Sequence, residues 1–220
     1  MAGLRSRQPM DLYLIRHTEV AKNLRGQHGG GDETVTERGK AQITAFAKQF
    51  AHLPQLTIVH QPDVRSRETA VKIAQQMREN REMIVKTREM PEFKGIDMGA
   101  VAGLSDKALA LRYPLVALGY LLWRSGFSLR RPKIAGAESL TDFATRVAAG
   151  LEKLLKTKHE SVLFVGTTST ILTLNHLLTN DGVFRRRAYH YYALQFGDCA
   201  HWRIVPTGLP RLAPGNVNAI

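Results

Sequence analysis

The chain has 220 residues, and its 31 lysines and arginines against 19 acidic residues give a formal net charge of +12. This balance favours an anionic partner such as a small phosphorylated substrate. A nucleic acid is not expected, because no zinc-finger spacing or RNA-binding aromatic signature accompanies the basic segments. The single cysteine excludes an internal disulfide framework and a cysteine-rich metal site.

Neither a membrane span nor a secretory signal is expected. The longest apolar runs, at residues 116–123 and 161–165, are too short to cross a bilayer. The first ten residues contain two arginines with no apolar segment after them. We therefore expect a cytoplasmic protein without a membrane partner, folded as one domain over residues 1–220.

Hydrophobic patterning predicts strands that alternate with helices, which is typical of a three-layer α/β/α fold with a mainly parallel central sheet. Glycine-rich loops are expected at residues 26–32 and 95–103. Residues 105–127 carry helical signals interrupted by Pro114, and we expect a helical insertion at about residues 105–130. The other expected elements are buried strands at 12–15, 56–59, 84–86 and 161–165, helices at 37–50, 65–77, 140–156 and 171–178, and edge strands at 192–196 and 200–205.

The first predicted strand ends at a cation beside an imidazole, Arg16 and His17, where a buried strand would otherwise continue apolar. Ligands of open α/β sheets bind just beyond the carboxyl ends of strands. Arg16 and His17 are therefore either candidate site residues or an ordinary solvated strand end. The residues that follow favour the first interpretation.

Residues 14–23 (LIRHTEVAKN) resemble the signature of the histidine phosphatase superfamily, which includes phosphoglycerate mutases and α-ribazole phosphatase-like enzymes. That signature is an apolar strand followed by Arg-His-Gly-Glu, with an asparagine seven residues after the arginine. Arg16, His17, Glu19 and Asn23 match it in register, and Thr18 replaces the glycine. The resemblance implies a phosphoglycerate mutase-like fold.

Later segments extend the resemblance over roughly the first three-quarters of the chain. Residues 32–42 (DETVTERGKAQ) resemble the family's D-x-x-L-T-E-x-G-x-x-Q segment, with Thr36 as a helix N-cap. Residues 65–70 (RSRETA) resemble its R-A-x-x-T-A helix start, which makes Arg65 the counterpart of a second phosphate arginine. Glu138 and Ser139 before an amphipathic helix also fit.

The resemblance implies phosphoryl transfer through a histidine. A neutral imidazole of His17 would attack a phosphoryl group and form a phosphohistidine that water hydrolyses. Arg16 and Arg65 would bind the phosphoryl oxygens and spread the charge of the transition state, and Asn23 would donate one more hydrogen bond. No metal and no cofactor is expected, because guanidinium groups perform the neutralisation.

One departure from the family is at Thr167. Family members normally carry a second histidine after a late buried strand, and the alignment puts Thr167 at that position. Threonine offers a neutral hydrogen bond in place of a protonated imidazole, although backbone N–H groups at the following helix could still face an anion. Removing one such donor typically lowers the rate by ~10²–10³.

A second departure concerns the general acid. The family's loop usually reads E-x-x-x-G-x-x-x-G, and the alignment places Gly95 where the glutamate belongs. Glu92 lies three residues upstream and Asp97 two residues downstream. Either carboxylate could serve if the loop differs in length, and Glu92 is the first candidate; both are also ordinary surface carboxylates.

His60 is a candidate replacement for the missing imidazole. It ends the second predicted strand, where the family commonly has serine, and could lie near the same pocket. The alternative is a partly exposed strand-end histidine. His176 is a poorer substitute, because it falls about two helical turns beyond Thr167.

These residues support three functional interpretations. The first is hydrolysis of a small phosphate monoester on His17, with reduced or specialised activity. The second is a non-hydrolytic protein that binds an anionic ligand or partner, and the third is an enzyme whose pocket serves another reaction. The insertion and the basic residues 130–133 would select the substrate. The sequence allows a homodimer without fixing the oligomeric state.

Overall fold

A computed structural model describes residues 8–27, 33–80, 84–125, 131–186, 189, 194–196, 199–206 and 211–212. Several sequence predictions lie outside the described residues. These are most of the first glycine-rich loop with Asp32, the start of the strand expected at 192–196, and Arg130 of the basic segment.

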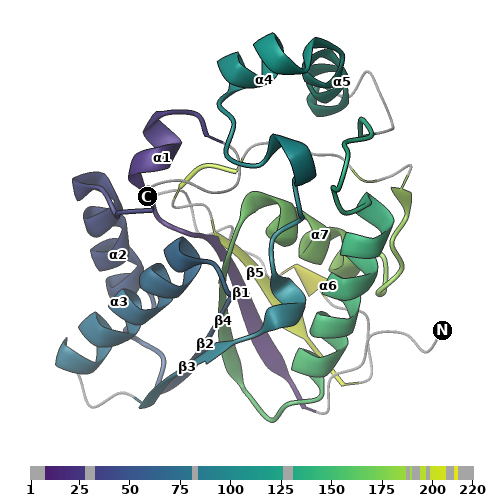
Figure 1. The fold of residues 1–220 in the computed structure, drawn as a ribbon. Helices are drawn as coiled ribbons and strands as arrows, with labels where there is room; N and C mark the ends of the chain where they lie inside the picture. Colours follow the sequence, from purple (N-terminus) through teal and green to yellow (C-terminus); the bar gives the residue numbers. More distant parts are fainter. Residues whose placement is uncertain are drawn as a thin grey trace.

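The centre of the molecule is a six-stranded, mainly parallel sheet (Figure 1). Its first four strands run parallel, β5 is antiparallel to β1, and β6 is antiparallel to β5. In spatial order the strands are β3 (Ile84–Glu89), β2 (Gln55–His60), β4 (Ser161–Gly166), β1 (Met10–Arg16), β5 (Cys199–Ile204) and β6 (Arg211–Leu212).

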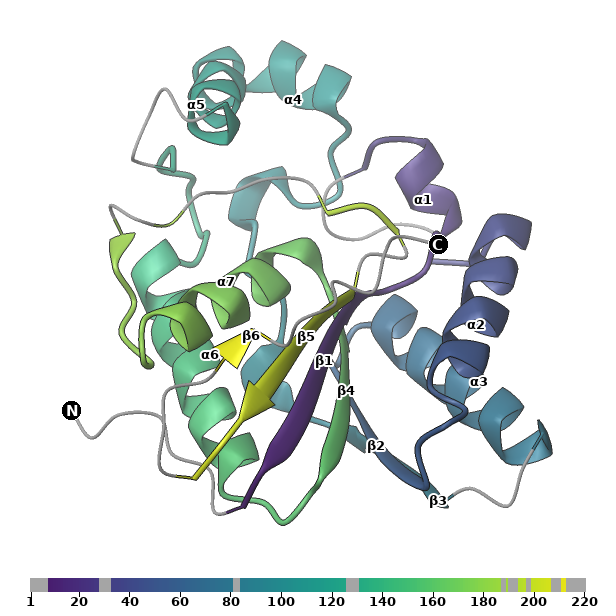
Figure 2. The ribbon, with the colours of Figure 1, turned by 180° about the vertical axis from the view of Figure 1, so that it is seen from behind.

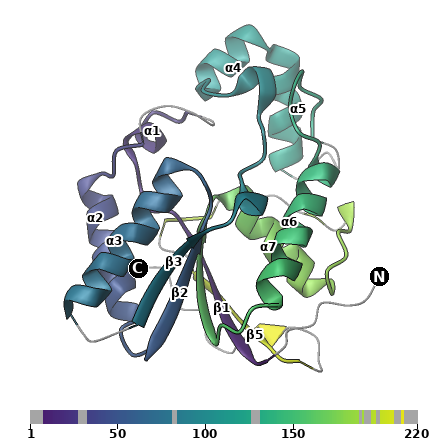
Figure 3. The same ribbon diagram turned by 60° about the horizontal axis from the view of Figure 1, so that its bottom comes forward.

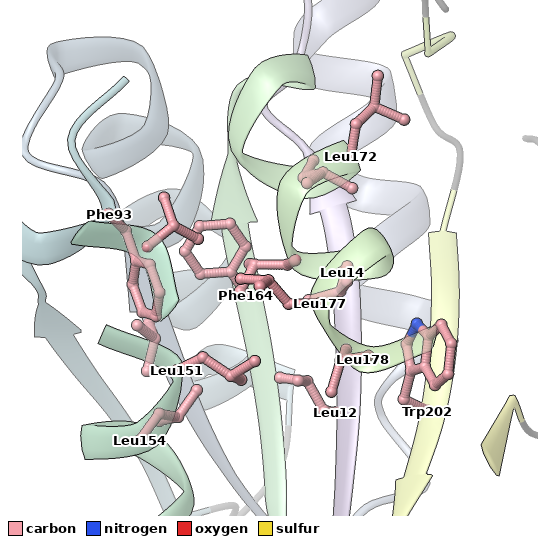
Figure 4. Close-up of a cluster of buried hydrophobic side chains, with 14 of the residues drawn as sticks. Leu12, Leu14, Phe93, Leu151, Leu154, Phe164, Leu172, Leu177, Leu178 and Trp202 are labelled. Atoms are coloured by element: carbon pink, nitrogen blue, oxygen red, sulfur yellow. The ribbon is translucent and has the colours of Figure 1, made fainter. Parts of the chain in front are cut away.

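Helices cover both faces of this sheet, so the expected three-layer architecture is confirmed (Figures 1 and 3). On one face lie α2 (Glu37–Gln49) and α3 (Val64–Asn80), and on the other lie α6 (Leu140–Leu155) and α7 (Thr168–Thr179). Each face of the sheet has its own apolar cluster. Figure 4 shows the cluster under α6 and α7, where Leu12 and Phe164 of the strands meet Leu151 and Leu177 of the helices.

The central strands are apolar on both faces because both faces are covered. Residues 12–15 of β1 and 162–165 of β4 are all buried. The helices follow amphipathic spacing and begin at side-chain caps, as α6 does where the Ser139 hydroxyl accepts a hydrogen bond from the Asp142 N–H at 3.1 Å. The predicted cap at Thr36 is also present, since its hydroxyl accepts from the Gly39 N–H at 3.0 Å.

The structure corrects the sequence prediction at three places. Helix α7 begins at Thr168 rather than at residue 171. Leu194 to Phe196, expected in an edge strand, are not in a strand, and β5 is an interior strand because residues 211–212 pair with it. The second glycine-rich segment contains a short 3-10 helix, η2 (Gly99–Val101), and follows another, η1 (Pro91–Phe93).

Two helices of the expected insertion stand beyond the carboxyl ends of the parallel strands (Figures 1 and 2). They are α4 (Asp106–Arg112) and α5 (Pro114–Arg124), and Pro114 separates them by occupying the first turn of α5, where its missing N–H leaves no hydrogen bond unmade. The short helix α1 (Ala21–Leu24) follows β1 at the same end of the sheet. Within the described ranges, the helices are all too short or too polar to traverse a lipid bilayer.

We expect Leu151→Ala to destabilise the fold far more than Leu115→Ala. Leu151 has no exposed surface and packs against the sheet, whereas Leu115 on α5 is 83% exposed. The first substitution should lower the free energy of unfolding by about 2–5 kcal/mol, because it removes buried methyl groups and leaves a cavity. The second should change it by less than about 0.5 kcal/mol. Urea denaturation measures both, and equal losses would contradict this packing.

Candidate active site

The carboxyl ends of β1 and β4 form the floor of the candidate site. Arg16 is the last residue of β1, and the N–H of His17 donates to the carbonyl of Gly166, the last residue of β4, at 2.9 Å. Arg65 lies in the first turn of α3, and its charge acts on His17 together with that of Arg16. The fold thus brings three of the predicted site residues together at the edge where open α/β sheets bind ligands.

His17 is held in the tautomer and charge state of a nucleophile. Its ring is buried, and Nδ1 lies 2.8 Å from the carbonyl oxygen of Thr18. A carbonyl only accepts, so Nδ1 carries the proton and the lone pair is on Nε2. Burial, followed by the positive charge of Arg65, lowers the pKa of His17 well below its usual value. The imidazole is therefore neutral near pH 7.

The guanidinium of Arg16 is engaged by a segment far along the chain. Its Nη1 donates to the carbonyl of Leu194, and the guanidinium carbon lies 3.8 Å from the centroid of the Phe196 ring. The same ring meets the His17 imidazole edge-on at 5.8 Å between centroids. Sequence reasoning missed Phe196, because a contact across so many residues carries no local signal and these residues were expected in a strand.

Two carboxylates hold Arg65 in place. Its Nη1 lies 3.4 Å from Oε1 of Glu33, and its Nε lies 3.2 Å from Oδ1 of Asp63. The Arg65 backbone N–H also donates to Oε2 of Glu33 at 3.0 Å. Glu33 was missed because it falls at a variable position of the family segment. Its side chain orients the guanidinium that is expected to bind phosphate.

The threonine that replaces the signature glycine is accommodated. Thr18 is fully buried, and its hydroxyl lies 3.0 Å from the hydroxyl of Thr69 on α3. Glu19 links the same motif to α2, since its N–H donates to Oε1 of Gln42 at 3.0 Å and its carboxylate accepts from the Thr36 hydroxyl at 2.8 Å. These contacts join the separate segments of the family pattern into one structure.

Asn23 lies on α1, and its side chain folds back onto its own helix. Its Oδ1 accepts a hydrogen bond from the Val20 N–H at 3.1 Å. The donors that this amide can offer to an anion are therefore the Nδ2 hydrogens.

Thr167 is the N-cap residue of α7, directly after β4. Its hydroxyl belongs to a cluster, 3.2 Å from the hydroxyl of Ser169 and 3.4 Å from that of Thr170. Its backbone N–H donates to Oε1 of Gln61. The expectation that backbone N–H groups here face an anion therefore needs correction for Thr167, whose N–H has an internal acceptor.

Gln61 is the main residue that sequence reasoning missed. It has no exposed surface, and besides accepting from Thr167 it donates through Nε2 to the carbonyl of Phe93 and, at 2.9 Å, to the hydroxyl of Thr170. A glutamine that follows a strand has no sequence feature that distinguishes it from an ordinary polar residue. Here it cross-links the end of β2 to the β4–α7 junction and to η1.

The geometry argues against Glu92 as the proton donor. Its carboxylate is ion-paired with Lys153 of α6 at 2.6 Å, and that hydrogen bond lowers the pKa of Glu92. A general acid needs the opposite, a raised pKa near the operating pH. Asp97 is exposed and accepts a hydrogen bond from the nearby Gly99 N–H at 2.8 Å, which stabilises its own loop.

Position 95 faces the end of β4. A Cβ atom built on Gly95 would lie 3.6 Å from the Thr167 hydroxyl and 3.7 Å from Nε2 of Gln61, which is ordinary van der Waals contact. The residue aligned with the family's glutamate thus lies beside the residue aligned with its second histidine. Glycine and threonine leave this side of the pocket without a titratable group at either position.

His60 is buried at the end of β2, with Nδ1 2.8 Å from the carbonyl of Gln61. Strand β4 lies between β2 and β1, and both Ile15 and His60 are in register with Val165. Two strand spacings of about 4.8 Å therefore separate the strand of His60 from that of His17. The ring of His176 is farther along α7, where it accepts from the Arg185 N–H at 2.9 Å and packs against Phe184.

Across the described residues, no group of three or more histidine, cysteine, aspartate or glutamate side chains is arranged to hold a metal ion.

Comparison with known proteins agrees with this geometry. The model of the histidine phosphatase superfamily (branch 1) matches residues 12–195, most of the chain. The chain belongs to this superfamily. Membership supports a phosphatase-type enzyme at the coarse level, and the resemblance of the opening motif is thereby confirmed.

Solved structures of several phosphatases share the fold. An α-ribazole phosphatase from Shigella flexneri superposes with a TM-score of 0.73 at 19% identity, covering 96% of this chain and 98% of the other. A mycobacterial glucosyl-3-phosphoglycerate phosphatase in complex with VO3 gives 0.73 at 19%, covering 95% and 100%. A phosphoserine phosphatase from Entamoeba histolytica gives 0.69 at 24%, covering 95% and 98%. No curated protein sequence matches the chain.

We expect Gln61→Met to destabilise the protein by about 1–3 kcal/mol, because it leaves the partly buried Thr167 N–H without its acceptor. Gln75→Met is the matched control, since Gln75 is exposed and its amide donates to its helix neighbour Glu79, at 3.1 Å. Urea denaturation measures both variants. Equal free energies of unfolding would show that the Gln61 contacts add nothing to stability.

Proposed function

We propose that this histidine phosphatase hydrolyses a small phosphate monoester through a phosphohistidine on His17. The observation that carries the proposal is the state of His17, a buried neutral imidazole whose Nδ1 is bonded to a carbonyl and whose neighbours are Arg16 and Arg65. Neutral Nε2 is the form that can attack phosphorus.

The reaction would proceed in two displacements. In the first, Nε2 of His17 forms a bond to phosphorus while the ester P–O bond breaks and the leaving oxygen takes a proton from solvent. In the second, water attacks the phosphohistidine and loses a proton to solvent, the N–P bond breaks and inorganic phosphate leaves. Arg16 and Arg65 would neutralise the phosphoryl oxygens in both steps, with Asn23 and the Thr167 hydroxyl as neutral donors.

Protonation of the leaving group is the step for which this scheme has no identified general acid. Position 95 is glycine, and Glu92 is ionised against Lys153. A general acid normally contributes ~10²–10⁴ in rate. The activity should therefore be specialised toward phosphate esters whose leaving group departs with little protonation.

The second candidate function is binding of an anion without turnover. It is favoured by the same side of the pocket, where Thr167 and Gly95 occupy the positions of the family's histidine and glutamate. The two functions share the Arg16 and Arg65 cations and differ in whether His17 forms a covalent bond.

The first test compares wild-type protein with His17→Ala. We expect hydrolysis of p-nitrophenyl phosphate, at least ~100-fold faster in kcat/KM than hydrolysis of a simple alkyl phosphate. His17→Ala should abolish it, and acid-labile phosphate should be trapped only on protein with His17. Because the pKa of His17 is lowered, the nucleophile stays neutral as the pH falls, and the rate should persist below the usual imidazole pKa of about 6.5.

His52→Ala is the matched control, because the exposed His52 also places Nδ1 against a carbonyl, that of Gln49 at 2.9 Å. It should leave the rate unchanged. Absence of turnover together with vanadate binding that requires Arg16 would reject hydrolysis and support the binding function.

Restoring the carboxylate tests the leaving-group argument. Gly95→Glu should raise kcat/KM for an alkyl phosphate by at least ~10-fold and change it little for p-nitrophenyl phosphate, because only the alkoxide needs the proton. The space beside Thr167 accepts a Cβ atom without a clash. Gly95→Ala separates the acid from the added side chain. An equal gain in both variants, or a gain for both substrates, would reject protonation as the limiting step.

A further inference from the structure

A buried lysine lies next to the candidate site residue Asn23. Lys22 on α1 has no exposed surface, and its ammonium group is ion-paired with Oε1 of Glu33. Burying an ammonium group costs several kcal/mol, and apolar side chains of similar volume usually serve stability equally well. Because buried and perturbed ionisable groups concentrate at functional sites, the location of this pair beside the nucleophile is informative.

Glu33 connects this lysine to the phosphate arginine. Its Oε1 contacts both the Lys22 ammonium group and Nη1 of Arg65, the latter at 3.4 Å, so the two cations lie side by side. Its Oε2 accepts the backbone N–H of Arg65 at 3.0 Å. The carboxylate of Glu33 thus contacts two cations, Lys22 on α1 and Arg65 in the first turn of α3.

Three positive charges act on His17. Arg16 acts from β1, Lys22 from α1 and Arg65 from α3, while the ring of Phe196 covers the imidazole without a charge. The carboxylates of Glu33 and Asp63 contact Arg65. The described part of the chain therefore sets three cations to act on the imidazole, each from a different element.

We propose that Lys22 is a third cation of the phosphate pocket, fixed beside Arg65 by Glu33, and that it supplies positive charge which Thr167 does not. Lys22 and Glu33 act as positioning residues. Lys22 adds to the field at the transferring phosphoryl group, and Glu33 keeps both cations in place before the substrate arrives. Cations fixed in advance stabilise developing charge without reorganisation during the reaction.

The proposal rests on the proposed phosphate pocket but not on turnover, since binding of inorganic vanadate and titration of the His17 ring can be measured in an inactive protein. Lys22→Met removes the charge. Lys22→Arg keeps it. Because Lys22→Met leaves Glu33 buried and unpaired, the double variant Lys22→Met/Glu33→Gln removes both charges and preserves a foldable interior.

We expect Lys22→Met/Glu33→Gln to bind vanadate roughly 10–100-fold more weakly by calorimetry. In the free protein, NMR should show a higher pKa of the His17 ring in the double variant than in Glu33→Gln, because these two proteins differ only in the Lys22 cation, whose removal favours the imidazolium. Lys22→Arg should keep both the vanadate affinity and the His17 pKa close to their wild-type values. The matched control is Lys156→Met, which removes an exposed lysine paired with Glu152 at 2.7 Å and should change neither.

The proposal is overturned if the folded double variant binds vanadate within about threefold of wild type. It is also overturned if the folded Lys22→Arg variant does not keep the wild-type affinity for vanadate. A purely structural role would lower stability without moving the His17 titration. If wild-type protein does not bind vanadate, the proposed function fails. The His17 titration is then the deciding measurement, and equal His17 pKa values in the double variant and in Glu33→Gln overturn the role of Lys22.

Discussion

The parallel pairing of β1 with β4 is the interaction on which the site depends. It places Arg16 opposite Gly166, and the hydrogen bond from the His17 N–H to Gly166 extends the pairing one residue beyond the strand. Both strands are buried on both faces, so a shift of register would move apolar side chains away from both clusters. The fold therefore holds the position of His17 relative to Thr167 much more firmly than a loop would.

Charged and neutral side chains lie on different sides of the candidate site. The α1 and α3 side carries Lys22 and Arg65 with their carboxylates, whereas the β4–α7 side is a network of hydroxyl and amide groups joined by Gln61. Such a neutral network can offer hydrogen bonds, but it cannot donate a proton at neutral pH. In this member of the histidine phosphatase superfamily, the candidate nucleophile His17 is thus present while position 95, where the family's proton donor is expected, is glycine.

The sequence predicted the features that local pattern determines. Ile43 and Phe46 on α2, and Ile73 and Met77 on α3, are buried as their helical spacing indicates, and the motif placed Arg16, His17 and Arg65 at one edge of the sheet. Contacts between distant segments could not be predicted from the sequence. Phe196, Glu33 and Gln61 are ordinary residues in sequence, and only the folded arrangement gives them partners at the site. The case for Glu92 is weakened by the ion pair that its carboxylate forms with Lys153 of α6, a contact that the sequence could not predict.

The contact of Arg16 with Leu194 and Phe196 has a consequence for synthesis of the protein. Arg16 and His17 are translated well before Leu194 and Phe196, because 178 positions separate Arg16 from Leu194. Chains grow at ~5–20 residues per second, so the nascent protein carries an unfinished pocket for on the order of ten seconds or more. Arg16 can therefore make these contacts only after translation has passed Phe196.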